Sequence, residues 1–146
     1  EGKYLDDILE NCEIEPQVMQ VECHPYFPQE ELRKITDHKN IKIMCWYPLG
    51  HGDKKLIEEP AITEIAEKYN KSNAQIILKW HIQMGFIVIP GSKNLEHIKD
   101  NFDLFDFELS KEDMEKIAML NKNIRYYNAS EEKLSGYAMY QPKYEK

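Results

Sequence analysis

The stretch Phe86-Ile-Val-Ile-Pro-Gly-Ser-Lys-Asn-Leu-Glu-His-Ile-Lys-Asp-Asn101 says most about the fold of this chain. Its four leading apolar residues predict a short strand covered on both faces, and the Pro-Gly pair ends that strand sharply. The polar residues that follow stand at a helix start, where unpaired backbone N–H groups form a ready anion site. The alternative is that Ser92 or Asn94 simply caps a surface helix, the more common role of such residues. The stretch alone is compatible with both interpretations.

The composition is that of a soluble globular protein with one domain. Of the 146 residues, 42% are hydrophobic and 31% are charged, which is enough for a real core. The balance of 19 basic against 26 acidic residues gives a net charge of −7, which argues against nucleic acid or an anionic membrane surface as a partner. No apolar run approaches the roughly 18 residues of a membrane span, and the N-terminus lacks a signal-peptide pattern.

The three cysteines, Cys12, Cys23 and Cys45, are odd in number and widely spaced. They therefore predict a reducing, cytoplasmic location rather than a disulfide framework or a zinc site. The five histidines show no metal-ligand spacing either, and His24 is expected to make a structural hydrogen bond. The first residue is Glu rather than Met, which permits the chain to be a piece of something longer.

Strands and helices alternate along the chain. Strands are predicted at residues 18–23, 41–46 and 86–89, and helices at 4–12, 28–38, 61–69, 73–84, 94–101 and 111–120. The segments 49–60 and 102–109 are expected to be loops, and the tyrosine-rich tail from Arg125 is expected to lie extended over a surface. This alternation predicts a parallel sheet. Three short strands are few for such a sheet, so the pattern indicates part of an α/β barrel or of a doubly wound sheet.

In either architecture, ligands bind at the C-terminal ends of the strands. Those ends are unusually polar or aromatic here, and they carry Glu22-Cys-His24, Trp46-Tyr-Pro-Leu-Gly50 and Ile89-Pro-Gly-Ser92.

Four motifs together resemble, in order and spacing, the second half of the aldo-keto reductases. They are Gln20-Val-Glu-Cys-His-Pro-Tyr26, Trp46-Tyr-Pro-Leu-Gly50, Val88-Ile-Pro-Gly-Ser92 and Phe105-Asp-Phe-Glu-Leu109. The resemblance implies an α/β fold, the (β/α)8 TIM barrel, of which this chain would be an incomplete C-terminal half with strands six to eight. Residues 1–146 would then belong to one barrel domain, with 125–146 as its C-terminal tail.

The same resemblance implies an NAD(P)H-dependent oxidoreductase that reduces aldehydes or ketones to alcohols. The family's aspartate, tyrosine, lysine and histidine tetrad has no counterpart here, so this chain supplies no catalytic residue and is predicted to be inactive alone. Its share would be to clamp NADPH, with NADH possible. The implied partners are a small carbonyl substrate and the missing N-terminal half of the barrel.

The resemblance assigns the nicotinamide end of the cofactor site to two residues. Gln20 matches the glutamine that binds the nicotinamide carboxamide, and an amide offers that group both a donor and an acceptor. Trp46 stands where the family usually has a tyrosine stacked on the nicotinamide ring. Each could instead be an ordinary strand or core residue.

Tyr47 replaces the usual serine near the pyrophosphate. The loop expected over the pyrophosphate contains Leu49, Gly50 and Asp53, of which Asp53 would latch the loop to a basic residue or simply be solvated.

The adenosine end matches the opening stretch. Ser92 and Asn94 correspond to contacts of the 2′-phosphate and its ribose, and Asp100 and Asn101 lie near the adenine. Gly91 and His97 replace the family's usual lysine and arginine, and Lys93 restores part of the lost charge. A histidine is mostly neutral near pH 7, so weaker selectivity for NADPH over NADH is expected.

Two other functions remain open at this point. The chain could belong to a module of reductase-like fold that binds nicotinamide nucleotide without turnover. It could also be an unrelated α/β domain whose strand ends resemble the family by chance.

Overall fold

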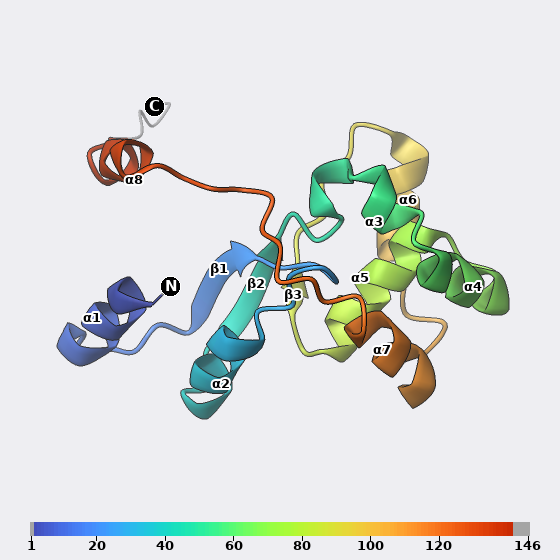
Figure 1. Cartoon of the computed structure of the whole chain (residues 1–146), viewed down its shortest axis with the longest axis horizontal. Coiled ribbons are helices and arrows are strands. Elements are labelled where there is room, and N and C mark those ends of the chain that lie inside the picture. The colour runs from blue at the N-terminus through green and yellow to red at the C-terminus, as the bar shows by residue number, and fades with distance from the viewer. Residues whose placement is uncertain (1, 142–146) are drawn as a thin grey trace.

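The computed structural model describes residues 2–141. Its helices and strands are, in chain order, α1 (Lys3–Asn11), β1 (Val18–Glu22), α2 (Glu30–His38), β2 (Lys42–Trp46), the short 3-10 helix η1 (Gly50–Gly52), α3 (Lys54–Ile57), α4 (Pro60–Tyr69), α5 (Asn73–Gln83), β3 (Ile87–Val88), α6 (Leu95–Phe102), α7 (Lys111–Ala118) and α8 (Glu131–Ala138). Figure 1 shows α4, α5 and α7 gathered on one side of the strands, while α1 and α8 lie apart from them.

The three strands form a parallel sheet in the order β1-β2-β3, as the alternation of strands and helices predicts. Gln20 pairs with Met44, and Met44 pairs with Ile87, so these three side chains share one face of the sheet. The α/β prediction is confirmed. All three strands end toward the same edge, which brings the polar and aromatic strand ends together.

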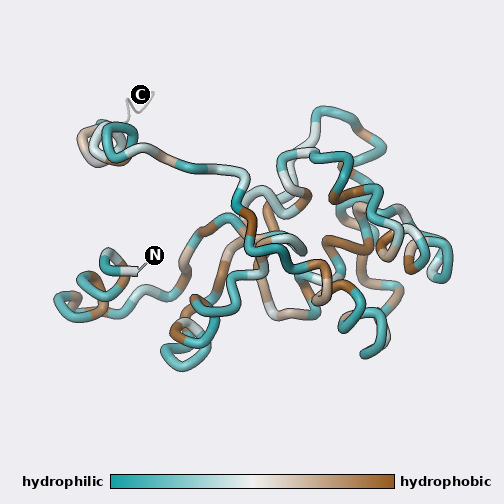
Figure 2. The backbone as a smooth tube through the Cα atoms, viewed as in Figure 1, coloured by the Kyte–Doolittle hydropathy of each residue, from teal (hydrophilic) through white to brown (hydrophobic). Residues whose placement is uncertain are grey.

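One face of the sheet is buried under helices. Cys23, Ile43 and Cys45 are at most 3% exposed on this face. They belong to one hydrophobic core with residues of the covering helices, such as Leu32 of α2 and Trp80 of α5. Figure 2 shows the hydrophobic stretches of the strands and of the neighbouring helices meeting in this region. The N-terminus of α5 is fixed by the predicted capping box between Ser72 and Gln75.

The opposite face of the sheet is open to solvent at several described residues, although Glu22 at the C-terminal end of β1 is buried. Val18 is 44% exposed, Ile87 is 38% exposed and Ile89, next to β3, is 41% exposed. Gln20 also lies exposed on this face. Parallel sheets are ordinarily covered on both faces, so this face is unusual for the architecture.

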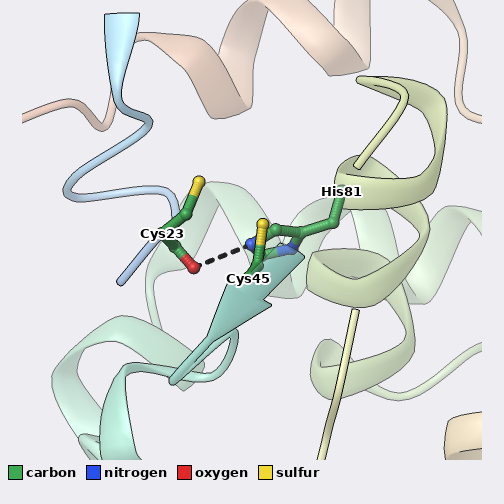
Figure 3. Close-up of side chains that lie close together, drawn as sticks. All are labelled: Cys23, Cys45 and His81. Atoms are coloured by element: carbon green, nitrogen blue, oxygen red, sulfur yellow. Dashed lines mark hydrogen bonds between the residues drawn. The ribbon is translucent and has the colours of Figure 1, made fainter. Parts of the chain in front are cut away.

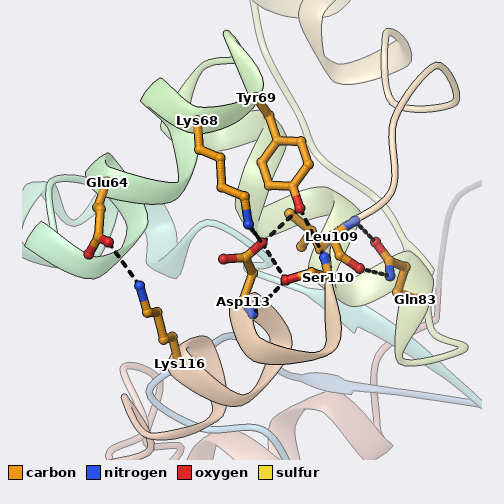
Figure 4. Close-up of polar contacts among 8 residues, drawn as sticks. All are labelled: Glu64, Lys68, Tyr69, Gln83, Leu109, Ser110, Asp113 and Lys116. Carbon is orange, nitrogen blue, oxygen red and sulfur yellow. Dashed lines mark hydrogen bonds and ion pairs between the residues drawn. The ribbon is translucent and has the colours of Figure 1, made fainter.

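A polar cluster joins α4 to the start of α7 (Figure 4). The carboxylate of Asp113 accepts hydrogen bonds through Oδ2 from Lys68 Nζ at 2.7 Å, Tyr69 Oη at 2.7 Å and Ser110 Oγ at 2.8 Å. Burial alone would raise the pKa of Asp113, but these three donors outweigh it and lower the pKa to about 2. The cluster therefore holds an ionised carboxylate between the two helices.

The structure corrects several predicted boundaries. Helix α2 begins at Glu30 rather than at Pro28, because Gln29 takes a left-handed conformation with φ 58°. The strand predicted at 86–89 contains only Ile87 and Val88. The predicted loop 49–60 contains η1 and α3, since Asp53 caps α3 by accepting from the Lys55 N–H at 3.0 Å.

The predicted tail is only partly extended. Residues 125–129 have no helix or strand, but Ser130 caps the helix α8 through its hydroxyl. The tail prediction was therefore wrong for residues 131–138, and its residues 142–146 lie outside the described part. Among residues 2–141, no helix combines the length and the apolar character needed to cross a membrane.

Candidate functional site

Two adjoining cavities form a groove at the C-terminal ends of β2 and β3. The first has a volume of about 640 Å³ and is lined by residues that include Trp46, Tyr47 and Pro90. The second has a volume of about 350 Å³ and extends to Ser92 and to Asp100 and Asn101 of α6. Both cavities share the lining residues Leu49, Ile57, Gly91 and His97. The groove therefore has an aromatic end at β2 and a polar end at α6.

A third cavity continues the aromatic end along the open face of the sheet. It has a volume of about 390 Å³, and its lining includes Gln20, Trp46 and Tyr127. Since Trp46 lines this cavity and the first one, its side chain lies at their junction. The structure thus places Gln20 and Trp46 beside one space, as the sequence predicts for the nicotinamide end.

The aromatic end is built from four neighbouring rings. The ring centroids of Trp46 and Tyr47 lie 4.2 Å apart, and those of Tyr47 and His51 lie 4.3 Å apart. Tyr127 meets Trp46 edge-on at 5.3 Å. Both Tyr47 (φ 52°) and His51 (φ 57°) have left-handed backbone conformations, which residues other than glycine rarely adopt. This strained turn directs the rings to the groove.

The polar end begins with a capped helix. Asn94 Oδ1 accepts a hydrogen bond from the Glu96 N–H at 2.9 Å, and Ser92 Oγ accepts one from the Asn94 N–H at 3.0 Å. The capping role that the sequence left open is therefore confirmed for Asn94. Ser92 lines the groove, whereas Lys93 and Asn94 are exposed beside it. His97 lines both cavities.

Gly50 and Asp53 form the support of the groove rather than its lining. Gly50 is buried with φ +59°, and a Cβ there would lie 2.7 Å from Leu56 Cδ2 and 3.0 Å from Tyr126 Cε2. The Tyr126 hydroxyl donates a hydrogen bond to Asp53 Oδ2 at 2.6 Å. Among residues 2–141, Asp53 is therefore bound by a tyrosine hydroxyl, whereas the prediction named a basic residue or solvent. This hydrogen bond and that from the Lys55 N–H lower the pKa of Asp53.

Glu22 holds the C-terminal segment against the strand ends, a role that the sequence analysis missed. Its carboxylate accepts from the Tyr126 N–H at 2.6 Å and from the Tyr127 N–H at 2.9 Å. His24 Nε2 lies 3.0 Å from Glu22 Oε1, which agrees with the structural role predicted for this histidine. Burial lowers the pKa of His24 despite the neighbouring carboxylate. The only sequence signal for this role of Glu22 was an acidic residue at the polar end of a predicted strand.

Cys23, Cys45 and His81 lie together in the core, although their spacing gave no hint of it (Figure 3). Their potential ligand atoms lie within 4.8 Å of one another, and all three side chains are 0% exposed. His81 Nδ1 lies 2.7 Å from the Ile77 carbonyl oxygen, and Nε2 lies 3.1 Å from that of Cys23. The Cys45 thiol and burial raise the pKa of Cys23 well above its usual value. The three side chains are therefore packed in the core, and both ring nitrogens of His81 already lie near backbone carbonyl oxygens.

Comparison with known proteins identifies the family. The profile of the Aldo/keto reductase family matches residues 3–122. The chain belongs to this family. Its sequence is 47% identical over 122 residues to a glyoxal reductase of Bacillus subtilis, and the match covers 84% of this chain and 44% of that protein. It is 41% identical over 126 residues to a 9,11-endoperoxide prostaglandin H2 reductase of Trypanosoma cruzi, of which 44% is covered.

Solved structures with a similar fold agree with the sequence comparison. The structure of a Gox0644 variant in complex with NADPH superposes with a TM-score of 0.79 at 37% identity, covering 83% of this chain and 44% of that one. The aldo-keto reductase MGS-M4, from a deep-sea metagenome library, gives a TM-score of 0.83 at 35% identity. The chain spans less than half the length of these relatives.

Proposed function

We propose that the complete protein is an NADPH-dependent reductase of aldehydes and ketones, in which this chain forms the cofactor-clamping half. The observation that carries the proposal is the groove, whose aromatic end at Trp46 and polar end at Ser92 and α6 lie on the same strand edge. Ligands bind at this edge of α/β barrels. A structural neighbour at 37% identity, the Gox0644 variant, has been solved with NADPH, which supports the choice of cofactor.

The proposal assigns residues 1–146 to the C-terminal half of one (β/α)8 barrel, with 125–146 as its tail. Two features support this. The open face of the sheet exposes apolar side chains such as Ile87, as expected where a further part of the barrel would pack. The relatives are about twice as long as the matched segment. The missing N-terminal half is thus the first partner that we propose, and a small carbonyl compound is the second.

The chemistry of the residues that line these cavities suits the cofactor. NADPH would supply the hydride when bound. Trp46 would cover one face of the nicotinamide ring, and the Gln20 amide would pair with the carboxamide. Ser92, at the polar end, offers a hydroxyl to the 2′-phosphate, and Asp100 and Asn101 line the far end for the adenine. Holding the nucleotide in one orientation is a positioning contribution to catalysis.

Activity measurements test the division of labour. The purified 146-residue chain is expected to reduce no standard aldehyde with NADPH, since it has no counterpart of the family tetrad. The complete protein is expected to do so. Turnover by the short chain would refute the assignment of a purely cofactor-clamping role. Saturable NADPH binding without turnover by the complete protein would favour the non-catalytic nucleotide-binding module instead.

Cofactor selectivity tests the polar end of the groove. Gly91 and His97 place no permanent positive charge at this end, and the exposed Lys93 replaces only part of the missing positive charge. The complete protein should therefore bind NADPH and NADH with similar affinity in a fluorescence titration. His97→Arg should raise the affinity for NADPH by about tenfold, which is the effect of one charge-assisted hydrogen bond. It should leave the affinity for NADH unchanged. A large NADPH preference of the unmodified protein would contradict this assignment.

We further propose a cytoplasmic location. All three cysteines are free, and Cys23 and Cys45 remain unpaired although they are neighbours in the core. Fractionation of cells that express the complete protein would check the location.

A further inference from the structure

The segment 122–127 crosses the strand ends and touches the wall of the groove. In Figure 1 this orange segment runs from α7 over the strands toward α8. Its first part is fixed by the backbone carbonyl of Tyr26, which accepts from the N–H groups of Lys122 at 3.1 Å and Ile124 at 3.3 Å. The segment is therefore held at several points before it reaches the groove.

The backbone of the segment is then fixed to β1. Glu22 is 2% exposed, and its two carboxylate oxygens accept separately from the N–H groups of Tyr126 and Tyr127. Hydrogen bonds to a buried carboxylate are among the stronger ones in proteins. Because both N–H groups bind one carboxylate, the direction of the Tyr126 side chain is set by β1.

The Tyr126 side chain in turn holds the groove wall. Its hydroxyl donates to Asp53 Oδ2, while Asp53 Oδ1 caps α3. Its ring fills the space over Gly50 that a side chain would otherwise occupy. The wall between these contacts includes Leu49 and Ile57, which line both cavities. The wall can move away from the strands only if the contacts of Tyr126 break.

We propose that Tyr126 is a positioning residue that couples the groove wall 49–57 to the tail segment 122–127. Each then stabilises the ordered state of the other, because a coupling free energy between two sites is reciprocal. A nucleotide bound in the groove would order the tail, and the ordered tail would raise the affinity of the groove for the nucleotide. The wall–tail coupling follows from contacts within the chain, whereas the effect of a nucleotide rests on the proposed function.

Hydrogen exchange of the complete protein without nucleotide tests the coupling in both directions. Tyr126→Phe keeps the ring and removes only the hydroxyl, and it should speed exchange of the wall amides by about tenfold. Asp53→Asn keeps a capping side chain for α3, and it should speed exchange of the Tyr126 and Tyr127 amides. Tyr140→Phe, at a tail tyrosine that is 71% exposed, is the matched control and should change neither segment. If each variant affects only the segment that contains it, the coupling does not exist.

A nucleotide titration tests the functional consequence. In the unmodified complete protein, NADPH should slow exchange of residues 122–127 as well as of the wall. In Tyr126→Phe, NADPH should bind about three- to tenfold more weakly, and the protection of the tail should disappear. Unchanged affinity and tail protection in this variant would overturn the proposal. If the unmodified protein bound no nucleotide, the proposed function would fail, while the exchange experiment would still decide the coupling.

Discussion

The two faces of the β1–β2–β3 sheet differ in how much of them the chain covers. On one face, Ile43 is 3% exposed and lies in a core shared with α2 and α5. On the other, Ile87 of the neighbouring strand is 38% exposed. Both are isoleucines of one parallel sheet, so the difference is not one of residue type. The difference arises because helices of this chain pack on one face of the sheet and leave apolar residues of the other face partly exposed.

The largest expected effect comes from a matched pair of truncations on these two faces. In the 146-residue chain, Ile43→Ala should lower the free energy of unfolding by about 2–5 kcal/mol, because it opens a cavity in a closed core. Ile87→Ala should cost less than about 1 kcal/mol there, since solvent already reaches the side chain. Urea denaturation measures both.

The same pair sharpens the comparison in the complete protein. If the rest of the barrel covers the open face, the cost of Ile87→Ala should rise to about that of a core truncation, roughly 2–5 kcal/mol. The cost of Ile43→Ala should stay the same. An Ile87→Ala variant that is equally mild in both proteins would show that the open face stays open.

A smaller effect is expected where the helical layer is held together at Asp113. Its folded pKa of about 2 lies below the unfolded value of about 3.9, so its ionised form stabilises the fold by roughly 2 kcal/mol above pH 4. This contribution should be lost as the pH falls from about 4 through 2. Asp113→Asn should lower stability at pH 7 and flatten the acid limb of the stability profile.

Asp106→Asn provides the control for this pH experiment. Asp106 is 60% exposed and forms an ion pair with Lys71 at 2.8 Å. Exposed pairs contribute only about 0–1 kcal/mol. Its replacement should therefore leave the stability profile nearly unchanged. An equal loss in both variants would mean that burial at Asp113 adds nothing.

The last pair of variants concerns two glycines that follow the C-terminal ends of β2 and β3. Gly50→Ala should destabilise by about 1–3 kcal/mol, because the residue has φ +59° and its Cβ would meet Leu56. Gly91→Ala should be nearly neutral, since nothing lies within 4 Å of its Cβ position. Thermal unfolding of the two variants checks the difference, and equal melting temperatures would contradict it.

Local patterns predicted much of the fold. The helical period of the apolar residues predicted most of the helices. The Ser72 and Gln75 side chains predicted the start of α5 as a capping box. The motifs at the strand ends also placed Trp46 and Ser92 at one edge of the sheet, where both line the groove, while their contacts with a cofactor remain a prediction. These signals are readable because each depends on a few neighbouring residues.

Contacts between distant residues could not be predicted in the same way. The Glu22 carboxylate accepts hydrogen bonds from backbone N–H groups more than one hundred positions away. An acidic residue at the end of a strand does not reveal such a distant partner in the sequence. The neighbourhood of Cys23, Cys45 and His81 likewise follows only from the packing of α5 on the strands. The helix α8 was missed because the aromatic residues of the tail gave no helical period.

A titration of the complete protein with NADPH tests the central claim most directly, when it is followed by tryptophan fluorescence. Trp46 lines the groove and Trp80 is buried in the core at 1% exposure, so only Trp46 can contact the nicotinamide. We expect a saturable quench that is largely lost in Trp46→Phe, although this variant still binds the nucleotide. Absence of saturable binding, or an equal quench in both proteins, would contradict the assignment of this groove to the cofactor.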